Sequence, residues 1–314
     1  MILSDNHIHT SFSTDSNEAM ENQVLKGIEL GFTSMTFTDH MDLNYPFLEE
    51  YKDLPQPIFV FDTNAYQKEI DRLNEKYGNK IQIKKGIEMG IKPDMLESGK
   101  ALFNDNSFDF VIASTHLIEN SDPYYTEFWE GKDVKSCLKT YYETILNNIS
   151  IWSDYDVVGH IDYMVRYAPD VRTLATKSAI KKSSALAENE APATKSAVEN
   201  NTFSTTPLDQ ALENHLYDNW NLIEEILKKV VSDGKGIEIN TAGFKYNLGH
   251  PNPHERILKL YKALGGEIIT VGSDAHESKY LGHEFKRAEE ILLNTGFKYY
   301  TEYEKRAPKF IALS

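Results

Sequence analysis

Short apolar runs recur along the whole chain and alternate with longer stretches of helical periodicity. The runs predict seven strands, at Met1–Asn6, Thr33–Thr38, Ile81–Ile87, Phe108–Ser114, Asp156–Gly159, Gly236–Asn240 and Glu267–Gly272. The longer stretches predict helices at Glu18–Gly31, Asn64–Tyr77, Lys135–Ser153, Leu208–Ser232, Pro253–Leu264 and Glu284–Leu293. Seven successive strand-then-helix units indicate an α/β protein with a parallel sheet, either a nearly closed barrel or a wide open sheet.

Polar side chains with metal-binding groups follow these strands. Six of the ten histidines stand just past a strand-like run, namely His7, His9, His40, His116, His160 and His276. In α/β proteins the carboxyl ends of parallel strands gather at one face, which carries the site. Residues from the first, middle and last strands can converge only if the sheet closes. The pattern therefore favours a barrel with its site at the carboxyl ends of the strands.

The residue types and spacings at these strand ends favour metal binding. His7 and His9, like Asp274 and His276, have the i, i+2 spacing that points two side chains to one face of a strand. Glu88 follows a buried strand between two glycines, where a carboxylate is costly unless a cation neutralises it; a helix cap or a buried salt bridge is the alternative. Histidines and carboxylates together suit Zn²⁺, Mn²⁺ or Fe²⁺ better than Ca²⁺ or Mg²⁺. The absence of cysteine ligands indicates a catalytic centre rather than a structural zinc site.

One segment departs from the alternating pattern. Residues 171–207 are rich in Ala, Ser, Thr and Lys, and the sequence ATKSA occurs there twice. This composition buries little apolar surface, so we expect disorder or a weak mobile helix in the loop after the fifth strand. An inert insertion is favoured over a substrate-gating lid. The chain as a whole, residues 1–314, is expected to form a single domain around one barrel, with this segment as an insertion.

The overall composition narrows the function classes. The formal net charge of −15 argues against a nucleic-acid-binding face, which requires clustered Lys and Arg. The single cysteine, Cys137, excludes an intrachain disulfide framework. We find neither a signal sequence nor an apolar run long enough to span a membrane. These features predict a cytoplasmic protein without membrane or nucleic-acid partners, as a monomer or small homo-oligomer.

The motifs around the predicted ligands are similar to those of one known family. The chain resembles the PHP (polymerase and histidinol phosphatase) family, and within it the monomeric histidinol-phosphatase branch. The resemblance rests on seven segments in the family's order: HIHTSFSTDS (His7–Ser16), FTDHMDLNYPF (Phe37–Phe47), GIEMGIKP (Gly86–Pro93), FDFVIASTH (Phe108–His116), VVGHIDYMVRY (Val157–Tyr167), GKGIEINTAGFKY (Gly234–Tyr246) and GGEIITVGSDAH (Gly265–His276).

The resemblance implies a distorted (β/α)7, TIM-like barrel with three divalent metal ions (Zn, Mn or Fe). It implies that the first ion is held by His7, His9, Glu88 and Asp274, and that the second shares Glu88 and adds His116 and His160. It assigns the third ion to Asp15, His40 and His276. Many members of the family have His where this chain has Asp15, and the harder carboxylate favours Mn²⁺ or Fe²⁺ at the third position.

The resemblance also implies a reaction. A hydroxide bridging two metals would attack the phosphorus of a small phosphomonoester, and Glu88 and Asp274 would act in catalysis as ligands. Arg166 suits bidentate phosphate binding, although it could instead be a surface residue paired with Asp162 or Asp170, and Lys245 is a second phosphate-binding candidate. The leaving group could take its proton from Asp162 or from metal-bound water.

The function implied by the resemblance is that of a histidinol-phosphatase in histidine biosynthesis. It would hydrolyse L-histidinol phosphate to L-histidinol and phosphate. The alternatives are another phosphoesterase of the family, acting on a nucleotide or phosphotyrosine substrate, and a non-catalytic metal-binding module. A non-catalytic module usually has lost ligands, whereas all nine positions here carry side chains that can bind metal.

Overall fold

A parallel sheet that curls into a nearly closed barrel organises the computed structural model, which describes residues 1–187 and 206–314. The strands of the barrel pair in the order β1-β2-β4-β5-β6-β7-β8, and a short β3 also pairs with β4. Their bounds are β1 Ser4–Ile8, β2 Ser34–Phe37, β3 His40–Met41, β4 Gln82–Gly90, β5 Phe110–Ser114, β6 Val157–Val158, β7 Gly236–Asn240 and β8 Ile269–Gly272. All seven strands predicted from the apolar runs are therefore confirmed, with parallel pairing throughout.

The barrel closes between its first and last strands, at the face where the strands end. Ile8 forms a parallel bridge with Ala275. The His9 N–H donates to the Ala275 carbonyl at 2.9 Å, and the Asp274 N–H donates to the His7 carbonyl at 2.9 Å. These contacts bring the two ends of the sheet together. The open-sheet alternative is thereby excluded.

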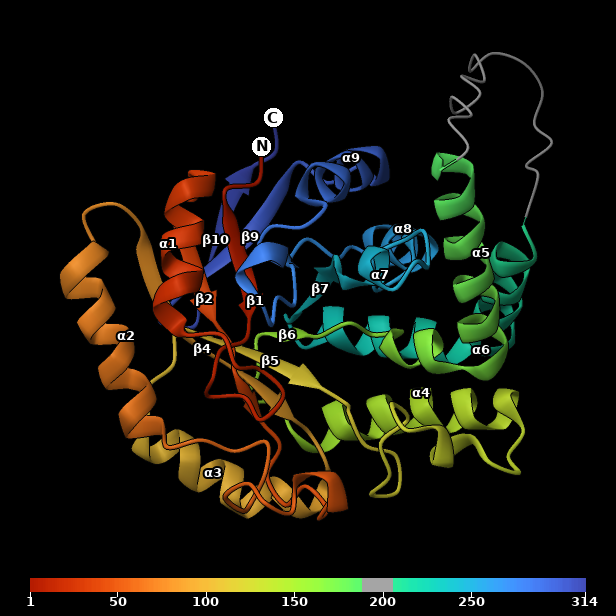
Figure 1. The fold of residues 1–314 in the computed structure, drawn as a ribbon, viewed down its shortest axis with the longest axis horizontal. Coiled ribbons are helices and arrows are strands. Elements are labelled where there is room, and N and C mark those ends of the chain that lie inside the picture. Colours follow the sequence, from red (N-terminus) through yellow and green to blue (C-terminus); the bar gives the residue numbers. More distant parts are fainter. Residues whose placement is uncertain (188–205) are drawn as a thin grey trace.

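Helices lie outside the strands (Figure 1). Their bounds are α1 Met20–Leu30, α2 Thr63–Tyr77, α3 Leu96–Asp105, α4 Val134–Ile151, α5 Pro169–Ala187, α6 Pro207–Ser232, α7 Ala242–Lys245, α8 Glu255–Ala263 and α9 Phe285–Thr295. Short 3₁₀ helices occur at Glu49–Tyr51, Pro93–Met95, Thr126–Trp129, Tyr163–Tyr167 and Ser278–Tyr280. The six predicted helices are confirmed. Side-chain caps fix several starts, such as the Asp62 carboxylate of α2 and the Thr206–Asp209 capping box of α6. Among the described residues, no helix is long and apolar enough to cross a membrane.

The described part of the low-complexity segment is helical. Its first part forms α5, which packs against α6 and buries Val171 and Ala175. An ion pair of 2.9 Å between Asp170 and His215 joins the two helices. Of the two alternatives expected for this segment, disorder or a weak helix, residues 171–187 form the helix, and a few buried side chains pack it against α6. Residues 188–205 lie outside the described part of the chain.

A terminal hairpin, not anticipated from the sequence, covers the amino ends of the strands. β9 (Tyr299–Glu304) pairs antiparallel with β10 (Ala307–Ala312). Glu302 of β9 binds the buried Lys84 Nζ of β4 at 2.6 Å, and Arg306 binds Asp156 at 2.6 Å. This end of the barrel is sealed by the hairpin, so the opposite end is left for a site.

Candidate metal centre

The predicted ligands come from the carboxyl ends of the strands and meet above the barrel. His7 is in β1 and His9 follows it, while His40 of β3 lies beside Glu88 of β4 in register. His116 and His160 stand two residues beyond β5 and β6, Asp274 and His276 follow β8, and Asp15 belongs to the β1–α1 loop. The structure brings all nine side chains together.

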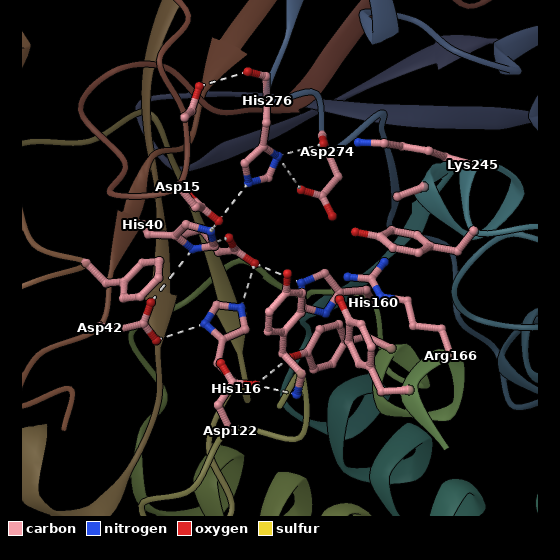
Figure 2. A pocket seen from close by; sticks show the side chains of 18 of the residues that line it. Asp15, His40, Asp42, His116, Asp122, His160, Arg166, Lys245, Asp274 and His276 are labelled. Atoms are coloured by element: carbon pink, nitrogen blue, oxygen red, sulfur yellow. Dashed lines mark hydrogen bonds and ion pairs between the residues drawn. The ribbon is translucent and has the colours of Figure 1, made fainter. Parts of the chain in front are cut away.

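These side chains surround the floor of a cavity of about 620 Å³. Seven of the nine line it directly, and His7 and His9 are fully buried just beneath them. Figure 2 shows His40, His116, His160, Asp274 and His276 arranged around the opening. The cavity is large enough for a small organic phosphate.

The innermost group consists of His7, His9, Glu88 and Asp274. The Nε2 atoms of His7 and His9 lie 3.0 Å apart. Glu88 Oε2 is 3.3 Å from His7 Nε2 and 3.4 Å from His9 Nε2, and Asp274 Oδ1 is 3.2 Å from His9 Nε2. Asp274 holds this position with a backbone φ of 56°, a left-handed conformation that Asp tolerates better than most residues.

The outer hydrogen bonds of the two imidazoles orient both Nε2 atoms as ligands. His7 Nδ1 lies 2.6 Å from Glu238 Oε1, an acceptor, so this nitrogen carries a proton. Ser13 Oγ donates to Asp39 and can therefore accept from His9 Nδ1 at 3.1 Å. With neutral imidazoles, both Nε2 atoms present lone pairs to each other, and a cation bound by both nitrogens removes that repulsion. The donor set fits a divalent metal ion.

Electrostatics support the same interpretation. Burial lowers the pKa of His7, but the carboxylates of Glu238, Glu88 and Asp274 outweigh it and raise that pKa well above its ordinary value. Burial lowers the pKa of His9 to about 3, with His276 and His40 acting in the same direction. Without metal, a proton therefore compensates the carboxylates at His7. A metal ion would displace that proton.

A second group shares Glu88 and adds His116 and His160. Glu88 Oε1 is 2.8 Å from His160 Nε2 and 3.2 Å from His116 Nε2, whereas Oε2 faces His7 and His9 and lies 2.9 Å from His40 Nδ1. Burial raises the pKa of Glu88, yet the surrounding histidines hold it well below its ordinary value. Oε2 is buried without a hydrogen bond of good geometry. The two oxygens of one carboxylate thus face two different sets of imidazoles.

The third group lies nearer the solvent and contains Asp15, His40 and His276. Asp15 Oδ2 is 3.1 Å from His276 Nε2 and 3.6 Å from His40 Nε2. The side chain of Asp15 is 32 % exposed, compared with 0 % for His7 and Glu88. The His9 ring contacts the rings of both His40 and His276, with centroids 4.2 Å from each, and the centroids of His40 and His276 are 5.9 Å apart.

Two carboxylates that support the imidazoles were not identified as site residues from the sequence. Asp42 Oδ1 lies 2.8 Å from His116 Nδ1. Glu238 contacts His7 Nδ1 and also accepts the His160 N–H at 3.1 Å. Gly272 is required beside it, because a Cβ there would collide with the Glu238 carboxylate. The one signal for Glu238 in the sequence was its charge between two isoleucines of the strand GIEIN.

We expect Glu238→Gln to weaken metal binding by about 10- to 100-fold, the range found when partners of metal-ligating histidines are removed. The amide can still accept one hydrogen bond, but it removes the negative charge that favours the His7 tautomer with a free Nε2. Titration of metal-depleted protein with Zn²⁺, monitored by calorimetry, measures the change. An unaltered affinity would assign Glu238 to packing alone.

Two positively charged side chains, Arg166 and Lys245, line another part of the cavity wall. Arg166 is 8 % exposed, and its guanidinium carbon lies 4.3–5.1 Å from the ring centroids of Tyr163, Tyr167 and Tyr246. Its Nε and Nη1 atoms are buried without hydrogen-bond partners. Lys245 Nζ lies 4.3 Å from the Tyr280 ring centroid. Within residues 1–187 and 206–314, neither cation forms an ion pair, so the pairing of Arg166 with Asp162 or Asp170 is not observed.

Asp162 does not line the cavity. Its Oδ1 accepts from Asn252 Nδ2 at 2.6 Å, and its Oδ2 accepts from the His254 N–H at 2.8 Å. These bonds turn the carboxylate toward the loop that precedes α8. The structure therefore does not place Asp162 among the groups that face the metal centre.

Comparisons with known proteins agree with this architecture. The family model described as PHP domain matches residues 5–242. A probable histidinol-phosphatase of Clostridium acetobutylicum is 29 % identical over 309 residues, covering 98 % of each chain. The histidinol-phosphatase of Lactococcus lactis is 29 % identical and covers 93 % of this chain and 91 % of its own. A crystal structure of the Lactococcus lactis histidinol phosphate phosphatase with Zn, L-histidinol and phosphate superposes with a TM-score of 0.75, at 25 % identity and 98 % coverage of both chains.

Proposed function

Because the chain belongs to the PHP domain family, we propose that it is a metal-dependent phosphatase that hydrolyses L-histidinol phosphate to L-histidinol and phosphate. The observation that carries this proposal is one cavity in which unpaired cations, Arg166 and Lys245, stand beside a cluster of histidines and carboxylates. Such a cavity suits a phosphate ester that must be bound and cleaved in one place.

In this proposal three divalent ions bind the nine clustered side chains. His7, His9, Glu88 and Asp274 would hold the first; Glu88, His116 and His160 the second; and Asp15, His40 and His276 the third. The Lactococcus lactis structure contains zinc, whereas the carboxylate of Asp15 in this chain favours manganese or iron at the third position. When bound, such ions neutralise phosphate charge and lower the pKa of water.

The remaining residues bind and orient the ester. Arg166 offers a planar fork that matches two phosphoryl oxygens, and Lys245 adds a second positive charge. Water attacks phosphorus, the ester P–O bond breaks, and the departing alcohol oxygen takes up a proton. Because both oxygens of Asp162 accept hydrogen bonds from the 252–254 loop, we assign this proton to water in the cavity.

Phosphate release from three substrates tests the proposal. We expect the metal-loaded protein to hydrolyse L-histidinol phosphate with a kcat/KM at least about 100-fold above those for p-nitrophenyl phosphate and a mononucleotide, since recognition of polar substrate groups gives large discrimination. A chelator-treated sample serves as the control. Equal, low rates on all three esters would reject histidinol phosphate as the substrate.

A further inference from the structure

Arg166 is held in the cavity wall by its backbone and by aromatic rings. Among the described residues, its Nε and Nη1 atoms have no hydrogen-bond partner. Two of the rings that contact the guanidinium, Tyr163 and Tyr167, belong with Arg166 to one 3₁₀ helix. The third, Tyr246, directly follows α7. The place of the guanidinium therefore depends on how this 3₁₀ helix is fixed to its neighbours.

The residue that precedes the 3₁₀ helix, Asp162, connects it to the 252–254 loop. Asp162 is 1 % exposed, and its carboxylate accepts from Asn252 Nδ2 at 2.6 Å and from the His254 N–H at 2.8 Å. Its carbonyl accepts from the Val165 N–H at 3.0 Å, so its backbone is the start of the helix. One buried carboxylate thus joins two segments that lie 90 positions apart.

The same loop is joined in turn to α7, which carries Lys245. Asn252 and Asn240 exchange backbone hydrogen bonds of 2.7 and 2.8 Å at the end of β7. Asn240 Oδ1 accepts from the N–H of Ala242, the first residue of α7, at 2.9 Å. Both asparagines are 0 % exposed. A chain of buried hydrogen bonds therefore connects the two segments that carry the cations of the cavity wall.

The relative position of these two cations matters for binding a phosphate group. Figure 2 shows Arg166 and Lys245 on the same side of the cavity opening. Both must reach oxygens of one phosphate together, and a displacement of about 1 Å in an active site can cost about 100-fold in rate. Only a carboxylate at position 162 can accept from both donors of the loop, because the amide of an asparagine offers one acceptor oxygen.

We propose that Asp162 is a positioning residue that acts through Arg166. Its hydrogen bonds to the 252–254 loop hold the guanidinium where, together with Lys245, it binds the substrate phosphate. This inference rests on the proposed function, in which Arg166 meets a phosphate group. Asp162 itself faces away from the cavity and touches neither the ester nor the metal ions.

Asp162→Asn tests this role, because the amide keeps one acceptor and turns an NH₂ group toward the second donor. We expect the dissociation constant of inorganic phosphate, measured by calorimetry on the Zn²⁺-loaded protein, to rise about 10- to 100-fold. The kcat/KM for L-histidinol phosphate should fall by a similar factor. Metal content per chain and the circular dichroism spectrum should equal those of the wild type.

Exchanging the two hydrogen-bond partners provides a rescue. Asn252→Asp alone should weaken phosphate binding, because it places two carboxylates against each other. In the double variant Asp162→Asn/Asn252→Asp, the new amide can accept from the His254 N–H and donate to the new carboxylate. We expect the double variant to bind phosphate more tightly than either single variant. If it binds no more tightly than Asp162→Asn, the bond between these positions does not hold Arg166.

A double-mutant cycle with Arg166→Met shows whether Asp162 acts through the arginine. Without the guanidinium there is nothing for Asp162 to position. In this background Asp162→Asn should therefore change kcat/KM by less than about 2-fold, since residues that act through one another are not additive. An equal loss in both backgrounds would reject the role.

Asp156→Asn is the matched control. Asp156 directly precedes β6, is also buried, and accepts from the Val111 N–H at 2.8 Å and from Arg306 Nε at 2.6 Å. Its replacement should lower the free energy of unfolding and leave phosphate affinity unchanged. An equal loss of phosphate affinity would assign the effect of Asp162→Asn to a general loosening of the barrel and reject the positioning role.

Two further outcomes separate this inference from the proposed function. If the wild type prefers L-histidinol phosphate and Asp162→Asn binds phosphate as tightly as the wild type, the positioning role is rejected and the proposed function stands. If Asp162→Asn binds phosphate more weakly but the wild type does not prefer this ester, the positioning role stands and L-histidinol phosphate is rejected as the substrate.

Discussion

Glu88→Gln is expected to lower kcat by about 1,000-fold or more, because in the proposed centre Glu88 is a ligand shared by two metal ions. Glu88 Oε1 faces His116 and His160, and Oε2 faces His7 and His9. A glutamine can offer one ligand oxygen, but its NH₂ group is a donor and cannot bind a cation. We therefore expect the variant to keep its fold and to lose bound metal.

Three measurements distinguish this loss from unfolding. Metal content per chain should fall below that of the wild type, kcat should fall as stated, and the circular dichroism spectrum should be unchanged. Glu277→Gln, on the rim of the same cavity, should retain metal content and turnover. If Glu88→Gln keeps full activity, then Glu88 is not a shared ligand and the assignment of the first two ions is wrong.

The barrel could be predicted because its strands are buried on both faces. Such strands form continuous apolar runs, which even a two-residue strand such as β6 Val157–Val158 retains within a longer run. The hairpin β9–β10 has no such signal, since β10 is exposed along its whole length. The packing of helix α5, expected only as a weak mobile helix or as disorder, was not foreseen for a related reason. Its sequence is rich in Ala and Lys and shows no clear apolar periodicity, so the few side chains that pack against α6, such as Val171, could not be recognised.

The clustering of the metal-binding side chains was predictable from strand ends, whereas their supporting contacts were not. His7 and Glu238 are 231 positions apart, and only the closed sheet brings them to 2.6 Å. Asp162 shows the opposite case. Its place after His160 suggested a catalytic role, but contacts with the 252–254 loop turn it away from the cavity. The position of a residue along a strand predicts which face of the sheet its side chain lies on. Its hydrogen-bond partners depend on residues far away in the sequence and cannot be predicted in this way.

Arg166→Met is expected to reduce kcat/KM for the phosphate ester by about 100- to 1,000-fold, as when one charge-stabilising donor is removed from an active site. The same change should leave the free energy of unfolding equal to that of the wild type or raise it by about 1 kcal/mol, because it removes a buried cation without an ionic partner. Methionine can keep the apolar contacts with Tyr163, Tyr167 and Tyr246. Opposite effects on stability and activity are typical of a residue kept for binding.

Steady-state kinetics and urea unfolding of the same preparations test both halves of this prediction. Arg166→Lys should recover only part of the lost activity, since it keeps the charge and loses the fork that binds two oxygens. Arg287, which stacks on Phe244 at 4.1 Å outside the cavity, provides the control. Arg287→Met should leave kcat/KM unchanged. A destabilised Arg166→Met with normal kinetics would instead show that the three tyrosines, and not a substrate phosphate, are the reason for an arginine at this position.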